Sequence, residues 1–115
     1  MEKDNNIYIK HILDAIADIE KYISGKSFAE FQENTLIQDG VIRKIEIIGE
    51  AAKQMSDKFK KEHQEIPWRQ VVGLRNKLIH EYFGVDLEAI WLAAQKDLLL
   101  LKDQLKTILK QFSLL

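Results

Sequence analysis

The chain has 115 residues and a mass of 13.4 kDa, enough for one domain that buries roughly two thirds of the surface its unfolded chain exposes. Its 46% hydrophobic and 30% charged residues exclude a disordered chain and a membrane protein, and its net charge of −1 excludes an overall field that attracts nucleic acid. The absence of cysteine excludes disulfides and thiolate metal sites. We therefore expect a single domain over residues 1–115, cytoplasmic, with no signal peptide, no membrane span and no cofactor.

The first predicted helix covers about residues 6–24, and Gly25 follows as a natural helix end. The apolar residues that recur at helical spacing in this stretch are Ile9, Ile12, Leu13, Ile16, Ile19, Tyr22 and Ile23. His11 has only Asp14, three residues on, as a second metal-type ligand on this helix. We therefore interpret His11 as a solvated histidine.

A short helical turn and a second long helix follow. Ser27 and Glu30 form a capping-box pattern, which predicts the short turn. Apolar periodicity then predicts a helix over about residues 36–62. Its core stripe consists of Val41, Ile42, Ile45, Ile48, Ala52, Met55 and Phe59. Gly49 lies beside this stripe and is a poor helix former, so we expect another helix to approach closely there.

Glu46 and Glu50 stand four residues apart on this second helix. Paired carboxylates can act as acid and base or bind a divalent metal, but the helix offers no third metal ligand. A second interpretation pairs them with Arg43 and Lys53 of the same helix. In a third interpretation, one of the two glutamates contacts Arg75 and orients its side chain without touching the ligand itself.

The third predicted helix begins at Pro67 and carries the densest polar cluster of the chain. Arg75, Asn76, His80 and Tyr82 place a cation, an amide, an imidazole and a phenol within two helical turns. Taken singly, each has a plain structural interpretation: Arg75 pairs with a carboxylate, His80 is a half-exposed surface histidine and Tyr82 belongs to the core. Together they form a more specific pattern.

An apolar stripe predicts that this helix continues through Tyr82 and ends at the following Phe83-Gly84 pair. The stripe consists of Val71, Leu74, Leu78 and Tyr82. On such a helix Arg75 points into the apolar arc and requires an anion, while Asn76 and His80 lie together on one flank.

The last predicted helix covers about residues 87–112, with Asp86 as its N-cap. A seam with alternating spacings of four and three consists of Leu87, Trp91, Ala94, Leu98, Leu101, Leu105, Ile108 and Phe112. Further apolar residues outside the seam are Leu92, Leu99, Leu100 and Leu109. They fit either a wide buried face or, as we prefer, a second contact with a twin subunit. The whole pattern predicts an all-α, antiparallel bundle of four to five helices.

The Arg75-x4-His80 spacing, with a polar residue directly after the arginine, resembles the signature of the HEPN superfamily of all-α ribonucleases. Its extension to Tyr82 resembles the HepT toxins, whose genetic partner is the nucleotidyltransferase antitoxin MntA. Three further segments match that family in the same order, and together with the motif they cover nearly the whole chain. They are residues 47–52, 66–68 and 82–86, which read IIGEAA, IPW and YFGVD.

These residue types suit RNA cleavage in which the ribose 2′-OH attacks its own phosphodiester, because that reaction needs no metal. His80 can transfer the proton, Arg75 can stabilise charge on the phosphoryl oxygens, and Asn76 can hold the phosphate or orient His80. One histidine cannot easily make both proton transfers, which favours a dimeric site. The resemblance implies the same: HEPN ribonucleases are generally dimers with the motif at the interface.

The resemblance also implies that Tyr82 receives AMP from the antitoxin, whose complex with the toxin can reach a higher order. It therefore predicts the toxin component of a toxin-antitoxin system, with RNA as substrate. Two alternatives stay open from the residues alone. One is a non-catalytic helical module that binds nucleotide or serves a nucleotidyltransferase, and the other is a plain dimerisation bundle with Arg75 in a structural ion pair.

Overall fold

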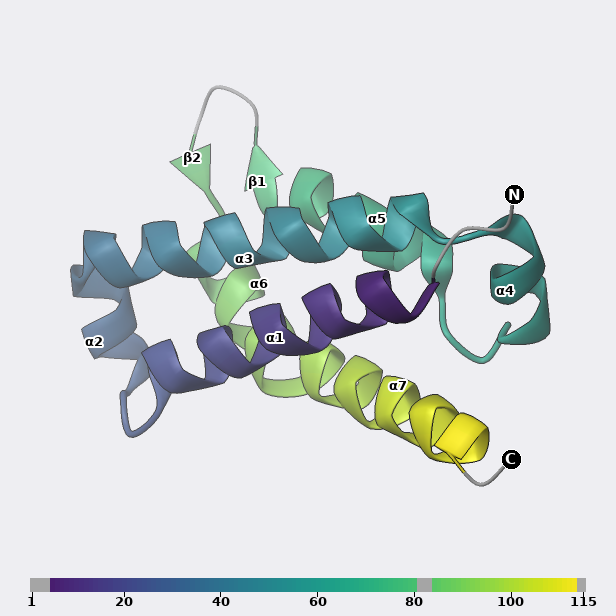
Figure 1. Cartoon of the computed structure of the whole chain (residues 1–115). Helices are drawn as coiled ribbons and strands as arrows, with labels where there is room; N and C mark the ends of the chain where they lie inside the picture. The colour runs from purple at the N-terminus through teal and green to yellow at the C-terminus, as the bar shows by residue number, and fades with distance from the viewer. Residues whose placement is uncertain (1–4, 81–83, 114–115) are drawn as a thin grey trace.

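The computed structural model describes residues 5–80 and 84–113, and helices make up nearly all of this part of the chain (Figure 1). The elements in order are α1 (Asn5–Ile23), α2 (Phe28–Glu33), α3 (Thr35–Gln54), α4 (Asp57–Glu62), α5 (Trp68–Leu78), β1 (Ile79–His80), β2 (Gly84–Val85), α6 (Leu87–Leu92), the π-helical turn η1 (Ala93–Asp97) and α7 (Leu98–Ser113). The predicted all-α class is confirmed. None of the described helices is long and apolar enough to cross a membrane.

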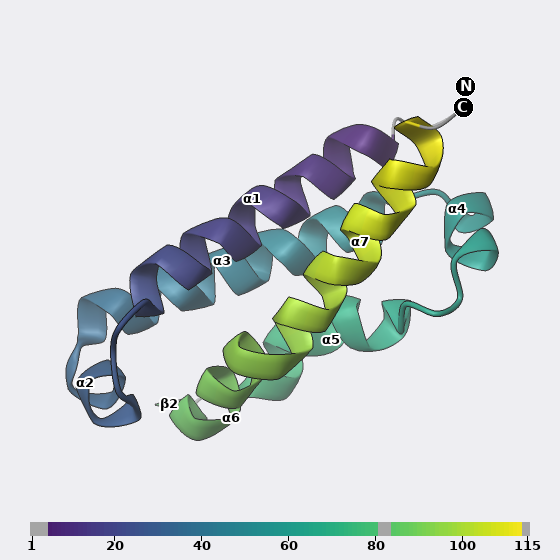
Figure 2. The ribbon, with the colours of Figure 1, turned by 90° about the horizontal axis from the view of Figure 1, so that it is seen from below.

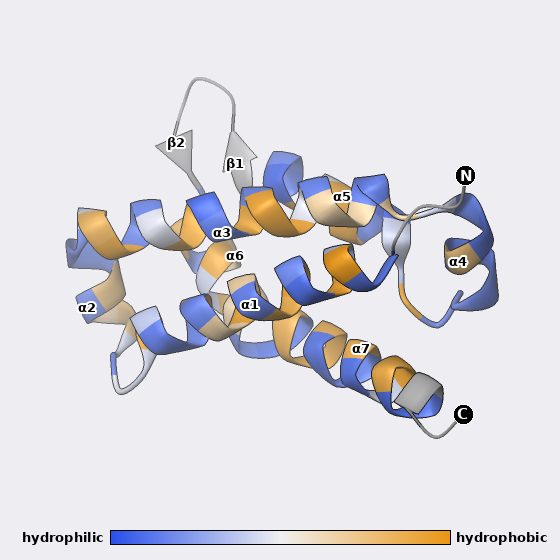
Figure 3. Cartoon of the chain, viewed as in Figure 1, coloured by the Kyte–Doolittle hydropathy of each residue, from blue (hydrophilic) through white to orange (hydrophobic). Residues whose placement is uncertain are grey.

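The long helices α1 and α3 run antiparallel side by side, α5 packs on α3, and α7 crosses α1 (Figures 1 and 2). Hydrophobic and hydrophilic residues alternate along each long helix, as the hydropathy colours show (Figure 3), and the buried side chains are hydrophobic. The fully buried side chains include Ile9, Ile12, Ile16, Ile19, Phe31, Ile45, Ile48, Ile66, Ile90 and Leu105. The predicted antiparallel bundle is therefore confirmed.

The predicted ends of the first helix and the predicted caps agree with the structure. Gly25 adopts φ 70°, the left-handed conformation that glycine tolerates best, directly after α1. The Ser27 hydroxyl accepts from the Glu30 backbone N–H at 3.2 Å, and the Glu30 carboxylate accepts from the Ser27 backbone N–H at 3.1 Å. At the last helix Asp86 accepts from the Ala89 backbone N–H at 3.0 Å. These caps lie where the local pattern predicts them.

The prediction of a single long helix over residues 36–62 is wrong, because the helix is interrupted between Gln54, where α3 ends, and Asp57, where α4 begins. The Ser56 hydroxyl accepts from the Phe59 backbone N–H at 3.1 Å and so starts α4 as an N-cap. The Ser56 backbone N–H in turn donates to the Asn5 side-chain oxygen at 3.0 Å. Asn5 lies at the start of α1, so a contact from a distant part of the chain stabilises this break.

The motif helix also ends earlier than predicted. α5 stops at Leu78, and Ile79 pairs with Val85 in the antiparallel strands β1 and β2, with His80 opposite Gly84. β-Branched residues favour such strands, and their pairing replaces the expected last turn of helix. Asn76 and His80 therefore do not share a helical flank. Tyr82 lies outside the described residues.

The last helix contains a π-helical turn at η1, Ala93–Asp97, which the seam did not predict. A π-turn inserts extra backbone into the helix and rotates the residues before it relative to those after it. As a result Ile90 is fully buried, whereas the seam residue Trp91 is half-buried and packs on Phe31 with ring centroids 5.3 Å apart. Beyond the turn the seam is buried as predicted at Leu98, Leu101, Leu105 and Ile108.

The close helix approach predicted at Gly49 is confirmed. A Cβ added at Gly49 would lie 3.2 Å from the Val72 carbonyl oxygen of α5. That neighbour is helix backbone, so it cannot rotate away as a side chain would. α3 and α1 are joined on another side by an ion pair between Lys44 and Asp18 at 2.8 Å, and the Lys44 hydrogen bond lowers the pKa of the Asp18 carboxyl.

Two glycine substitutions test this packing. Gly49→Val should lower the free energy of unfolding by about 1–3 kcal/mol, because the added atoms overpack the contact with α5. Gly73→Ala is the matched control, since a Cβ there meets nothing within 4 Å; it should raise the free energy of unfolding by about 0.5–1 kcal/mol through helix propensity. Urea denaturation followed by circular dichroism measures both. Equal effects of the two substitutions would contradict the role given to Gly49.

Candidate active site

Arg75 lies in the last turn of α5 and reaches across to α3. Its Nε donates to Oε2 of Glu46 at 3.3 Å. The Arg75 side chain is 49% exposed, so it does not enter the apolar arc as the helical projection predicts. The buried residues on this part of α5 are Val71 and Leu74. The expected anion is thus a carboxylate at the surface of the bundle.

Asn76 completes the cluster from the next position along the chain. Its Oδ1 accepts from Nη1 of Arg75 at 3.3 Å. The guanidinium is therefore held by a carboxylate from α3 and by an amide from its own helix. We call Glu46, Arg75 and Asn76 the arginine cluster.

The arginine cluster leaves binding capacity on the guanidinium. Among the described residues Arg75 donates to Glu46 and Asn76, and a guanidinium carries more N–H donors than these two bonds use. Both charged partners contact water, with exposed side-chain fractions of 49% for Arg75 and 34% for Glu46. Such a pair contributes little to stability, so it mainly fixes where the cation lies. An incoming phosphate can still engage the remaining donors.

The other predicted site residues are only partly placed. The backbone of His80 lies in β1, which follows α5 without a break, so it stays close in the chain to the arginine cluster. The side chain of His80 and the whole of Tyr82 lie outside the described residues. Their predicted roles as proton-transfer group and AMP acceptor remain predictions.

The three interpretations of Glu46 and Glu50 now separate. Glu46 contacts Arg75, in agreement with the interpretation that one of the two supports the arginine. Among residues 5–77 and 86–111, whose side chains the structure describes, neither glutamate forms an ion pair with Arg43 or Lys53, and no group of three or more His, Asp or Glu side chains is placed to hold a metal ion. Glu50 is exposed and lies beside a groove between α1 and α3.

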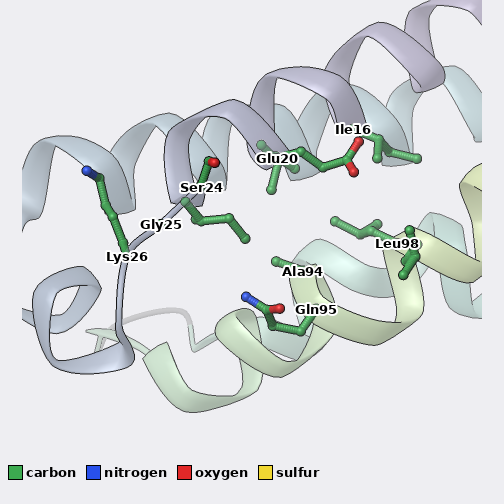
Figure 4. A pocket seen from close by; sticks show the side chains of 11 residues that line it. Ile16, Glu20, Ser24, Gly25, Lys26, Ala94, Gln95 and Leu98 are labelled. Atoms are coloured by element: carbon green, nitrogen blue, oxygen red, sulfur yellow. The ribbon is translucent and has the colours of Figure 1, made fainter.

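A cavity of about 430 Å³ lies between the end of α1 and the π-turn (Figure 4). Residues that line it include Ile16, Glu20, Ser24, Ala94 and Gln95. Both oxygens of the Glu20 carboxylate accept from Lys102 at 3.0 Å, so this carboxylate already has a partner. The cavity contains none of the predicted site residues, and sequence reasoning missed it because the π-turn that forms it left no periodic signal.

The fold and the cluster define a class: an all-α bundle that presents a supported arginine near a helix end, with a histidine in the strand that follows. Comparison with known families is consistent with this class. Residues 12–108 match the family described as "Ribonuclease HepT-like". The chain therefore belongs to the HepT-like ribonuclease family.

Individual relatives agree with this assignment. A "Probable ribonuclease HepT" of Thermococcus cleftensis is 39% identical over 96% of this chain and 100% of its own length. A "Putative RNase" of Caldanaerobacter subterraneus is 38% identical over 90% of this chain and 93% of its own. A "Gamma-glutamylcyclotransferase and putative RNase" of Methanocaldococcus jannaschii is 41% identical, and this chain spans only half of its length. No solved structure matches the chain.

The exposure of the Arg75–Glu46 pair predicts a small effect on stability. Arg75→Ala and Glu46→Gln should each change the free energy of unfolding by less than about 1 kcal/mol, because a solvent-exposed pair gains little. Leu74→Ala, from the adjacent buried position, is the control and should cost about 2–5 kcal/mol. Urea denaturation measures all three. A loss at Arg75 as large as that at Leu74 would instead support the structural ion pair of a plain dimerisation bundle.

Proposed function

We propose that this protein is a cytoplasmic, metal-independent endoribonuclease and the toxin of a toxin-antitoxin system. The observation that carries the proposal is the arginine cluster: Arg75 is exposed, oriented by Glu46 and Asn76, and has N–H donors left for a phosphate. Membership in the HepT-like ribonuclease family supports RNA as the substrate. The neutral overall charge means that the RNA must be held by this local site rather than by a general field.

The proposed reaction is a transesterification within the RNA. His80, as base, takes the proton of the ribose 2′-OH, and the 2′-oxygen attacks the neighbouring phosphorus. The bond from phosphorus to the 5′-oxygen breaks, and as it leaves that oxygen takes a proton from a protonated histidine, the partner subunit's His80, which acts as the acid. The products are a 2′,3′-cyclic phosphate and a 5′-OH end. Arg75 stabilises the negative charge that builds on the phosphoryl oxygens, and Asn76 holds the phosphate or orients His80.

Glu46 is a positioning residue in this mechanism. Its carboxylate accepts from Nε, the guanidinium nitrogen that is bonded to the aliphatic part of the side chain. The two terminal nitrogens of the guanidinium therefore keep N–H donors for the substrate. A carboxylate so close also opposes binding of a phosphate anion, which restricts the productive approach to the remaining donors. Glu50 forms no ion pair within the described residues and has no assigned step.

The proposal includes a homodimer, since the reaction needs both a base and an acid and one motif supplies one histidine. Leu92, Leu99 and Leu100 are 48%, 46% and 59% exposed, which leaves apolar surface uncovered before and after the π-turn. Beside it, a cavity of about 260 Å³ between α5 and α7 is lined by Leu74, Lys77 and Leu100 among others. A twin subunit on this face would bring a second α5 close to the first.

The proposed control by a partner rests on the Arg75-x4-His80-x-Tyr82 pattern and its resemblance to HepT toxins. An MntA-like nucleotidyltransferase would transfer AMP to the Tyr82 hydroxyl, and the complex of the two proteins can be of higher order. AMP on Tyr82, two residues beyond His80, adds phosphate charge and bulk near Arg75. That charge competes with RNA for the guanidinium.

The test is RNA cleavage in EDTA by chain whose intact mass has been measured. Wild-type chain of unmodified mass should cut RNA to 2′,3′-cyclic phosphate ends, while Arg75→Ala and His80→Ala from matched preparations should lose at least about a hundredfold in rate, the usual contribution of such groups. Arg69→Ala is the control, because Arg69 is an exposed arginine of the same helix that lines neither the cavity on the proposed dimer face nor the arginine cluster. After incubation with the nucleotidyltransferase and ATP, wild type should gain the mass of AMP and Tyr82→Phe should not.

Retained cleavage in both the Arg75 and the His80 variants would overturn the proposed mechanism. If unmodified wild type cuts nothing in EDTA or with added metal, yet binds nucleotide or a nucleotidyltransferase, the protein is the non-catalytic binding module instead. If RNA is cleaved only when metal is added, the protein is a ribonuclease but its reaction is not metal-independent.

A double substitution tests the dimer. Leu99→Glu with Leu100→Glu should convert a dimer to monomer in sedimentation velocity and lower the rate of RNA cleavage, because charge on the apolar face opposes its burial. Leu36→Glu, at a side chain that is 82% exposed at the start of α3, is the control and should do neither. A wild-type monomer at concentrations that cleave RNA would contradict the shared site.

A further inference from the structure

A groove of about 240 Å³ runs between α1 and α3, next to the arginine cluster. It is lined by Tyr8, His11, Arg43, Glu46, Ile47, Glu50, Ala51 and Gln54. Glu46 belongs to both places, since the carboxylate that lines the groove also accepts from Arg75 at 3.3 Å. A ligand that reaches Arg75 over α3 can therefore extend into the groove.

One wall of the groove carries two aromatic rings. Tyr8 and His11 stand three residues apart on α1, and their rings meet edge to face with centroids 6.3 Å apart and planes at 84°. Tyr8 is half-buried against the core, so its ring is held, while His11 is exposed. Because the two rings are perpendicular, one presents its flat face to the groove and the other presents its edge beside that face. That shape suits a planar, unsaturated ligand.

The charges of the groove select against a strongly charged ligand. Arg43 contributes a positive charge and Glu50 a negative one, and the charge of Glu46 is shared with Arg75. The remaining polar group on α3 is the Gln54 amide, which both donates and accepts hydrogen bonds. A nucleobase has these properties: it is planar, neutral and edged with donors and acceptors.

We propose that this groove binds a base of the RNA that flanks the phosphate held at Arg75. The inference rests on the proposed ribonuclease function and adds to it a second contact: Tyr8 stacks on the face of the base, the perpendicular His11 ring meets the base with its edge, and Gln54 reads the polar edge of the base. Arg43 lies beside the same groove, where it can contact the backbone phosphate of the bound nucleotide. The groove thereby selects single-stranded RNA, because a base in a duplex is not free to enter it.

Binding to RNA that cannot be cut tests the groove independently of cleavage. Single-stranded 2′-O-methyl RNA, labelled at one end, is titrated with wild type, Tyr8→Leu and Tyr8→Phe, and Kd is read by fluorescence anisotropy. Tyr8→Leu should raise Kd about 5- to 100-fold through loss of base stacking, and Tyr8→Phe should keep the wild-type Kd. Tyr22→Leu is the matched control, because Tyr22 lies roughly 20 Å further along α1 and packs beside Gly40.

A set of oligomers that each lack one base locates the contact. Loss of the base that enters the groove should weaken wild-type binding and should have little further effect on Tyr8→Leu, since the ring and the base act as one pair. Far-ultraviolet circular dichroism verifies that each variant is folded. Equal Kd values for wild type and Tyr8→Leu, or a base effect that persists in full in Tyr8→Leu, would overturn the inference.

The two proposals fail in different ways. If wild type binds the oligomers through Tyr8 and yet cuts no RNA, the groove stands as an RNA-binding site and the ribonuclease mechanism fails. If wild type cuts RNA and Tyr8→Leu leaves both Kd and the cleavage rate unchanged, the mechanism stands and the groove carries no base.

Discussion

The site depends on the close approach of α5 to α3. A Cβ at Gly49 would lie 3.2 Å from the Val72 carbonyl oxygen, so the two helix backbones meet where one of them has no side chain. Glu46 lies about one helical turn from Gly49, and Arg75 about one turn from Val72. Because the helices touch, the carboxylate and the guanidinium meet at 3.3 Å. A larger residue at position 49 would separate the helices and the charged pair with them.

The arginine cluster shows how a chain with a net charge of −1 can still present a cation to a polyanion. Arg75 is held at the surface rather than buried, so it keeps its charge without the large desolvation cost of an interior site. Glu46 orients the guanidinium but also offsets part of its charge. The result favours a phosphate that arrives in one geometry over general attraction for nucleic acid, and it makes further contacts such as the groove on α1 and α3 valuable for binding.

The helix ends around the motif define where its groups can lie. The pairing of Ile79 with Val85 ends α5 at Leu78, so His80 enters a strand instead of a fourth helical turn. Arg75 and His80 therefore do not share a helical face, because the backbone changes from helix to strand between them. The π-turn Ala93–Asp97 has a similar effect on the last helix, where it turns Ile90 into the core and leaves Leu99 and Leu100 exposed.

The sequence by itself determined the features that depend on neighbours a few residues apart: the helical periodicity, the end at Gly25, the Ser27 and Asp86 caps, and the Arg75-x4-His80 spacing that resembles the family signature. Only the tertiary structure decided the features that join distant residues. These are the break that Asn5 stabilises at Ser56, the choice of Glu46 as the partner of Arg75, and the groove that brings Tyr8 and His11 to α3. The physical reason is range, because periodicity and capping act within a turn or two, whereas these contacts depend on how whole helices pack.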